Sequence, residues 1–151
     1  MPRLVTTLVL IAAIAPLTAC EDETARNEAM LFLDRFEDVD VDDELEERRI
    51  SITQIREMVI TDHDVDAARD ACVDAYDALI EAEDQHALAR HLLVQSGGTT
   101  EMDVPPEVAL EINAAIDHSD DAISRSRELF PRCNHAVTQL ERRYPRQRAG
   151  H

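Results

Sequence analysis

The chain has 151 residues, enough for one domain, and 32 Asp and Glu residues against 15 Arg and no Lys give a formal net charge of −17. This balance excludes a nucleic-acid-binding surface, which must be basic to offset the phosphate charge. Three Gly residues, with neither GxxxxGK[ST] nor GxGxxG, exclude the common phosphate-binding loops. An apolar content of 44% argues against wholesale disorder.

Residues 1–20 have the pattern of a bacterial export signal. Arg3 is the only charged side chain before Cys20, and the apolar run that follows it, residues 8–15, is shorter than the ~20 residues that span a bilayer. The segment Leu17-Thr18-Ala19-Cys20 resembles the lipobox of bacterial lipoproteins. The resemblance implies a signal peptide at 1–19, lipid on Cys20 and a short tether at 20–24. The alternatives are an ordinary signal peptide cut after Ala19 and an uncleaved membrane anchor.

A lipidated Cys20 predicts a mature chain held on a bacterial membrane in the cell envelope, since two acyl chains suffice for stable anchoring. In Gram-negative bacteria, Asp directly after the lipidated Cys often retains a lipoprotein in the inner membrane. This chain has Glu21 followed by Asp22 at that point. The choice between inner and outer membrane, both facing the periplasm, therefore stays open. Beyond residue 20, no motif indicates a family.

The mature sequence predicts an all-α, four-helix bundle-like domain over residues 25–144, followed by a flexible basic tail at 145–151. Apolar residues at three- and four-residue spacing place helices at about 24–36 and 43–60. A strand is the alternative around the β-branched residues 50–53. Capping residues and the Gly97-Gly98 pair bound a long helix at about 62–96, and Pro105-Pro106 opens another at 105–143. Pro131 is expected to kink or break this last helix.

The two long helices are expected to form an antiparallel hairpin stapled by a Cys72–Cys133 disulfide. A ladder of Ala at seven-residue spacing, from Ala68 to Ala89, allows a partner helix to approach closely. The midpoint between positions 72 and 133 falls inside the connecting loop, and both cysteines lie on the predicted apolar stripes. The spacing therefore places the two thiols level with each other, and export exposes them to an oxidising compartment.

The sequence contains only incomplete versions of known metal-binding motifs. Asp38, Asp40 and Asp42 resemble the start of an EF-hand loop, but Asp43 and Arg49 replace its Gly and Glu. Glu83 and His86 form the E-x-x-H unit of di-iron bundles, but a second unit is missing. A single metal ion or a haem held by His86 and His118 at one level of the hairpin is the alternative to a structural role for these residues.

No hydrolase signature is present, because G-x-S-x-G is missing and S-x-x-K is impossible without Lys. The favoured interpretation is a non-catalytic binding or structural module. Its candidate surfaces are an acidic segment, residues 37–47 with eight carboxylates, and the arginines near the C-terminus. An envelope protein or an anionic membrane surface would be the partner. The candidate partner-binding residues are Glu37, Asp38, Asp40, Asp42, Asp43, Glu44, Arg142, Arg143 and Arg146.

Overall fold

The computed structural model describes residues 18–98 and 103–145, and every regular element in these ranges is an α-helix apart from a short helical turn at Asp103. The four helices are α1 (Thr18–Glu37), α2 (Leu45–Arg56), α3 (His63–Gln95) and α4 (Pro106–Arg143). The predicted fold class is therefore confirmed.

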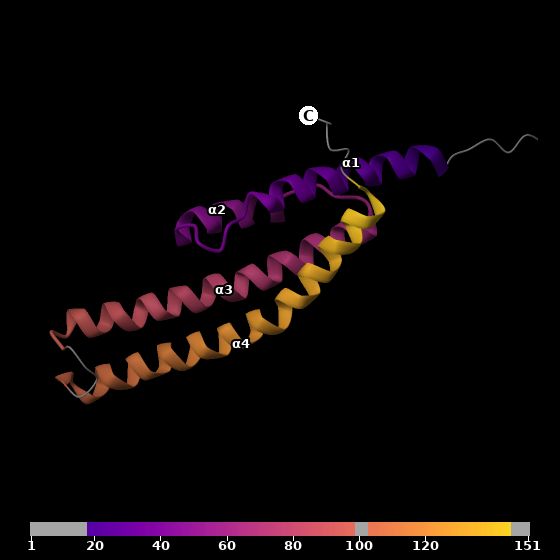
Figure 1. The fold of residues 1–151 in the computed structure, drawn as a ribbon. Helices are drawn as coiled ribbons and strands as arrows, with labels where there is room; N and C mark the ends of the chain where they lie inside the picture. The colour runs from indigo at the N-terminus through magenta and orange to yellow at the C-terminus, as the bar shows by residue number, and fades with distance from the viewer. Residues whose placement is uncertain (1–17, 99–102, 146–151) are drawn as a thin grey trace, which may run out of the picture.

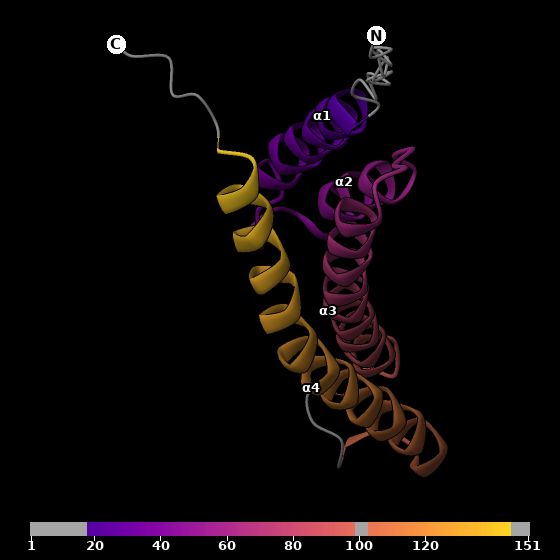
Figure 2. The same ribbon diagram turned by 90° about the vertical axis from the view of Figure 1, so that its right-hand side faces the viewer.

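Helices α3 and α4 form a long antiparallel hairpin, and α1 and α2 cover only the half that contains its open end (Figures 1 and 2). The main apolar core lies in this covered half, where residues of all four helices pack together. The other half projects beyond α2 as two helices alone, with a small second core around Ala89, Ile112 and Ala115.

The two helices of the hairpin pack against each other along the predicted stripes of small residues. Every member of the alanine ladder in α3, at positions 68, 75, 82 and 89, is buried. Across from it, α4 buries Ala115, Ser119, Ala122 and Ser126 in the same way. Small side chains on both faces let the helix backbones approach closely over many turns.

The disulfide lies where the register places it. Cys72 and Cys133 are joined with their Cα atoms 4.5 Å apart, and neither is exposed to solvent. The predicted pairing is confirmed, and with it the antiparallel alignment of α3 and α4.

All five aromatic rings of the chain lie in the covered half. Phe32 stacks on Phe36, which meets Tyr76 of α3 edge-on at 5.9 Å between ring centroids. Tyr76 in turn meets Phe130 of α4 edge-on at 5.1 Å. The rings thus connect α1 to both helices of the hairpin, and burial raises the pKa of Tyr76.

The turn between α2 and α3 is held by side chains at both ends. Asp62 caps α3, since its carboxylate accepts from the N–H groups of Asp64 and Val65 at 3.0 Å. Glu28 of α1 accepts from the N–H groups of Asp62 at 2.9 Å and Thr61 at 3.0 Å, and from the Thr61 hydroxyl at 2.7 Å. Glu28 therefore ties the start of α3 to α1.

At the other end of α3, Gly97 adopts a positive φ of 71°, a common way to end a helix.

Two boundaries differ from the sequence predictions, the start of α1 and the end of α2. Helix α1 begins at Thr18, so the backbone is helical through the residues expected to form a tether. Helix α2 ends at Arg56, short of the predicted end at about residue 60, and Val59 beyond it is 90% exposed. Helix α4 agrees with its predicted range: it continues through Pro131 and bends toward α1 in its second half, as expected of a proline inside a helix (Figures 1 and 2).

Removing the disulfide in a Cys72→Ala/Cys133→Ala variant is expected to lower the free energy of unfolding by about 4 kcal/mol, because the bond closes a long loop in the unfolded chain. Urea unfolding followed by circular dichroism measures this change. The helical spectrum before unfolding should match that of the wild type. A loss below about 1 kcal/mol would contradict the loop-closure account.

Glu28 makes stability depend on pH. The hydrogen bond from the Asp62 backbone, with those from Thr61, lowers the pKa of Glu28 despite partial desolvation. A lowered folded-state pKa means that the contribution is present above the unfolded pKa and is lost as pH falls through the folded value. Glu28→Gln is therefore expected to cost up to about 1 kcal/mol at pH 7, and less as the pH falls toward 3. Glu57→Gln serves as the control, and a difference from wild type that stays constant with pH would count against this role.

Candidate functional site

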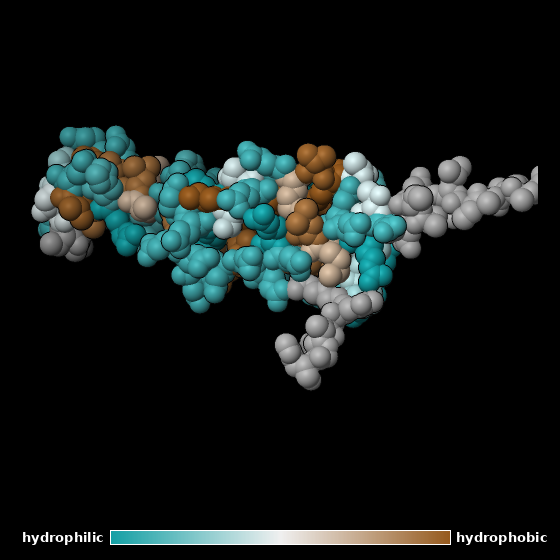
Figure 3. All heavy atoms as spheres, turned by 90° about the horizontal axis from the view of Figure 1, so that it is seen from above, coloured by the Kyte–Doolittle hydropathy of each residue, from teal (hydrophilic) through white to brown (hydrophobic). Residues whose placement is uncertain are grey.

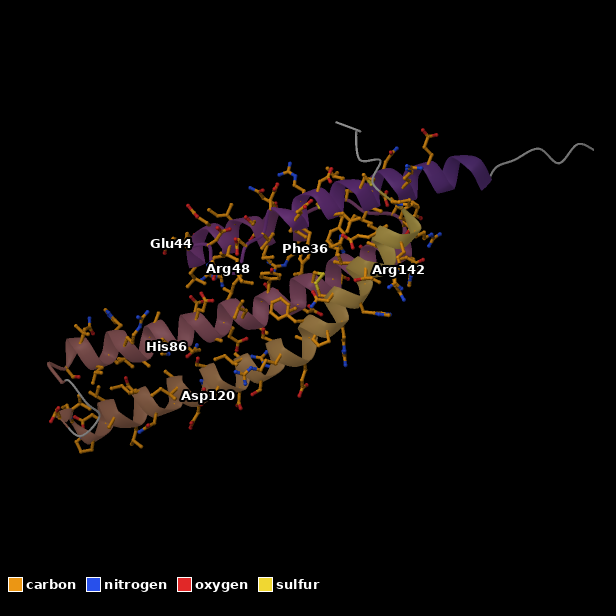
Figure 4. All side chains as sticks on the ribbon, viewed as in Figure 1. Phe36, Glu44, Arg48, His86, Asp120 and Arg142 are labelled. Carbon is orange, nitrogen blue, oxygen red and sulfur yellow. A yellow bond between two sulfur atoms is a disulfide. The ribbon has the colours of Figure 1, made fainter. Side chains whose placement is uncertain are left out.

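A cavity of about 410 Å³ lies between the acidic loop that precedes α2 and the hairpin. The loop side presents Asp42, Asp43 and Glu44, followed by Leu45 at the start of α2. The α3 side presents Glu83, His86 and Arg90 together with small apolar residues. Helix α4 contributes Ser119 and Ile123. Figure 4 shows Glu44 at the start of α2 and His86 on α3, on the two sides of this region.

Arg48 joins the loop to the hairpin. Its side chain is only 3% exposed, and it reaches from α2 toward α3 (Figure 4). One guanidinium nitrogen lies 2.5 Å from Glu83 Oε1, and the other donates to the backbone carbonyl of Asp43 at 2.8 Å. Its Nε is buried without a hydrogen-bond partner. The guanidinium therefore holds two opposite walls of the cavity at once.

The acidic loop is also ordered by its own carboxylates. The N–H of Asp42 donates to Asp40 Oδ1 at 2.9 Å, and the N–H of Asp40 donates to Asp43 Oδ2 at 3.3 Å. Such side-chain-to-backbone bonds are typical of Asx turns. They leave the side chains of Asp38, Asp42 and Glu44 exposed to solvent.

Two further arginines of α2 pair with acids of α3. Arg49 donates to both oxygens of Asp84, at 2.8 and 3.0 Å, and Arg56 lies 2.5 Å from Asp77. The hydrogen bond with Asp84 raises the pKa of Arg49. Both pairs are solvent-accessible, so each contributes little by itself. Together with Arg48 they fix the position of α2 along α3.

The candidate metal residues do not converge on one site. Across residues 18–98 and 103–145, no group of three or more His, Cys, Asp or Glu side chains is placed to hold a metal ion. His86 lines the cavity but is exposed, and Glu83 is already paired with Arg48. His118 is exposed, whereas its neighbour Ser119 turns into the hairpin and donates to the Ala82 carbonyl at 2.9 Å. This hydrogen bond occupies the Ser119 hydroxyl, which is buried beside the cavity.

The candidate arginines near the C-terminus lie in different surroundings and do not form one site. Arg143 lies 2.6 Å from Asp64 and over the ring of Tyr144, with 5.2 Å to the centroid. It therefore connects the end of α4 to the start of α3. Arg142 is exposed in the same turn, and Arg146 lies outside the described residues, as does the lipobox except for Thr18, Ala19 and Cys20, whose backbone belongs to α1.

Arg48 is not among the functional residues predicted from the sequence. A signal was present: Arg48 lies three residues after Leu45 and four before Ile52, on the stripe that α2 turns to the core. A charged residue at such a position requires a buried partner. The partner is Glu83, which had been considered only as a metal ligand.

Comparison with protein-family models, with curated proteins and with solved structures finds no match to this chain. Within the described residues, no helix is both long and apolar enough to cross a membrane.

Arg48→Met is expected to lower the free energy of unfolding by about 2 kcal/mol, because it leaves a partly buried carboxylate and a backbone carbonyl without their donor. It should also speed hydrogen exchange at the Asp42 amide, which belongs to the loop that Arg48 holds. Arg49→Met is the matched control: it removes the neighbouring, exposed pair and should cost below about 1 kcal/mol. Equal effects of the two variants on stability and exchange would refute the special position of Arg48.

Proposed function

We propose that the mature chain is a lipid-anchored protein of the bacterial cell envelope that acts as a non-catalytic binding module. In this proposal the acidic segment, residues 37–47, captures a basic partner. The observation that carries it is the Arg48 contact, which holds the carboxylate-rich loop in one conformation on the hairpin.

The charge distribution supports this choice of surface. The arginines of α2 are directed mainly at acids of α3, and among them Arg49 also pairs with one carboxylate of the segment, Glu46, at 3.4 Å, so negative charge dominates the exposed surface of the segment. Such a concentration of one sign accelerates the approach of an oppositely charged protein. The loop is already ordered, so less conformational entropy is lost on binding than with a flexible acidic tail.

The position of the segment suits an anchored module. Residues 20 and 37 both belong to α1, and at ~1.5 Å per residue the helix separates them by about 25 Å. A lipid on Cys20 would leave the acidic segment away from the anchor. Figure 3 shows that the face formed by α1 and α2 is mostly hydrophilic, with separate apolar patches, as expected of a water-facing surface.

The proposal is tested by neutralising the exposed carboxylates of the segment in the full-length chain purified in detergent. Asp38→Asn, Asp42→Asn, Glu44→Gln and Glu47→Gln are combined in one variant. Binding of a fluorescent deca-arginine peptide at physiological salt is expected to weaken by at least about 10-fold, because local charge pairs are lost. Cross-linked envelope proteins should be lost in parallel from pull-downs with this variant.

The matched control removes the same number of charges from exposed positions of α4. It combines Asp117→Asn, Asp120→Asn, Glu111→Gln and Glu128→Gln, whose side chains are all exposed. This variant should bind the peptide within about twofold of the wild type. Equal weakening by both variants would mean that net charge, rather than the acidic segment, attracts the peptide, and would overturn the proposal.

A further inference from the structure

We propose that the 410 Å³ cavity is a socket for one basic side chain of the partner, an arginine or lysine whose charged head meets the acidic loop and whose aliphatic stem lies against the hairpin. This inference rests on the proposed function, because it names the chemical group of the basic partner that the acidic segment would capture. It adds a defined position to what would otherwise be a diffuse attraction.

The size and lining of the cavity fit an amphipathic cation. Its volume lies within the ~300–1,000 Å³ range of small-molecule sites, so it is large enough to hold one extended side chain. Arginine and lysine combine an apolar stem with a charged head. The lining offers both kinds of contact, with Leu79, Ala82 and Ile123 on the hairpin and Asp42, Asp43 and Glu44 on the loop.

The charge balance of the lining favours a cation over an anion. Four carboxylates line the cavity, and Arg48 already compensates one of them, Glu83, from behind the wall. Arg90 is the only Arg among the lining residues. The three carboxylates of the loop therefore exceed the positive charge that faces them. An incoming guanidinium or ammonium group restores the balance.

Both walls are held before any ligand arrives. Arg48 ties the loop to α3 through Asp43 and Glu83, and the Ser119 hydroxyl ties α4 to α3 at Ala82, beside the cavity. A cavity with fixed walls discriminates by stem length as well as by charge, because a short stem cannot bring both ends into contact together. This property separates a socket from a surface that merely attracts cations.

The test titrates the ¹⁵N-labelled full-length chain in detergent micelles with the peptide acetyl-Gly-Gly-Arg-Gly-Gly-amide, followed by NMR. Amide resonances of residues 42–45, 82–90 and 119–123 are expected to shift. A citrulline peptide, with the same shape but no charge, should cause no shift. A peptide whose guanidinium stem is two methylenes shorter should bind at least about fivefold more weakly, because less apolar surface is buried. Equal binding of the long- and short-stem peptides would overturn the socket.

Variants separate this inference from the proposed function. Asp42→Asn/Glu44→Gln removes two carboxylates of the cavity, whereas Asp38→Asn/Glu47→Gln removes two from the same segment outside it. The socket predicts loss of arginine-peptide binding in the first pair only. Equal weakening by both pairs would refute the socket and leave the acidic segment as the binding surface. Unchanged binding in both pairs would refute the socket and the proposed function together.

A filling substitution tests the cavity without changing charge. Ala87→Leu places a larger side chain on its wall, and Ala114→Leu makes the same change at an exposed position of α4. Ala87→Leu is expected to weaken arginine-peptide binding at least about fivefold, while Ala114→Leu leaves it unchanged. Circular dichroism confirms that both variants fold. Full binding by a folded Ala87→Leu variant would contradict the socket.

Discussion

The close approach of α3 and α4 is the constraint on which the rest of the structure depends. Alanines at seven-residue spacing in α3 face small residues of α4, so the two backbones stay near each other over most of their length. Bulky side chains are correspondingly few, and the chain has only five aromatic rings. The disulfide supplies part of the stability that a larger apolar core would otherwise provide, because it limits the unfolded state rather than adding contacts to the folded one.

Helix α2 attaches to this hairpin differently from α1. Helix α1 contributes Phe32 and Leu33 to the core, whereas α2 buries Ile52 and Ile55 and pairs three arginines with acids of α3. Ion pairs depend on direction and distance more strictly than apolar contacts do. The position of α2, and of the acidic loop before it, is therefore set by the register of charges along α3.

The sequence predicted the hairpin because it is encoded by local periodicity and by one long-range relation, the level placement of Cys72 and Cys133. The end of α2 was predicted wrongly, since the apolar residues Val59 and Ile60 extend the pattern beyond the last helical turn. The cavity was not predictable in the same way. It arises where Arg48 holds a loop against α3. The apolar stripe of α2 indicates that position 48 is buried, but a pairing between positions 35 residues apart leaves no periodic signal that identifies Glu83 as the partner.

A buried arginine is an expensive means of holding a loop. Apolar residues of similar volume often stabilise a fold as well as a buried ion pair does, because charges lose their hydration on burial. An apolar side chain at position 48, however, would make no directed bond to the Asp43 carbonyl and would leave Glu83 without its partner. Arg48 therefore contributes less to stability than to the position of the loop. It fixes the carboxylate-rich loop above an open cavity, whereas repulsion among the carboxylates would otherwise push the loop away from the hairpin. This arrangement lies at the boundary between the packed half and the projecting half of the molecule, where the side chain of the proposed partner would enter.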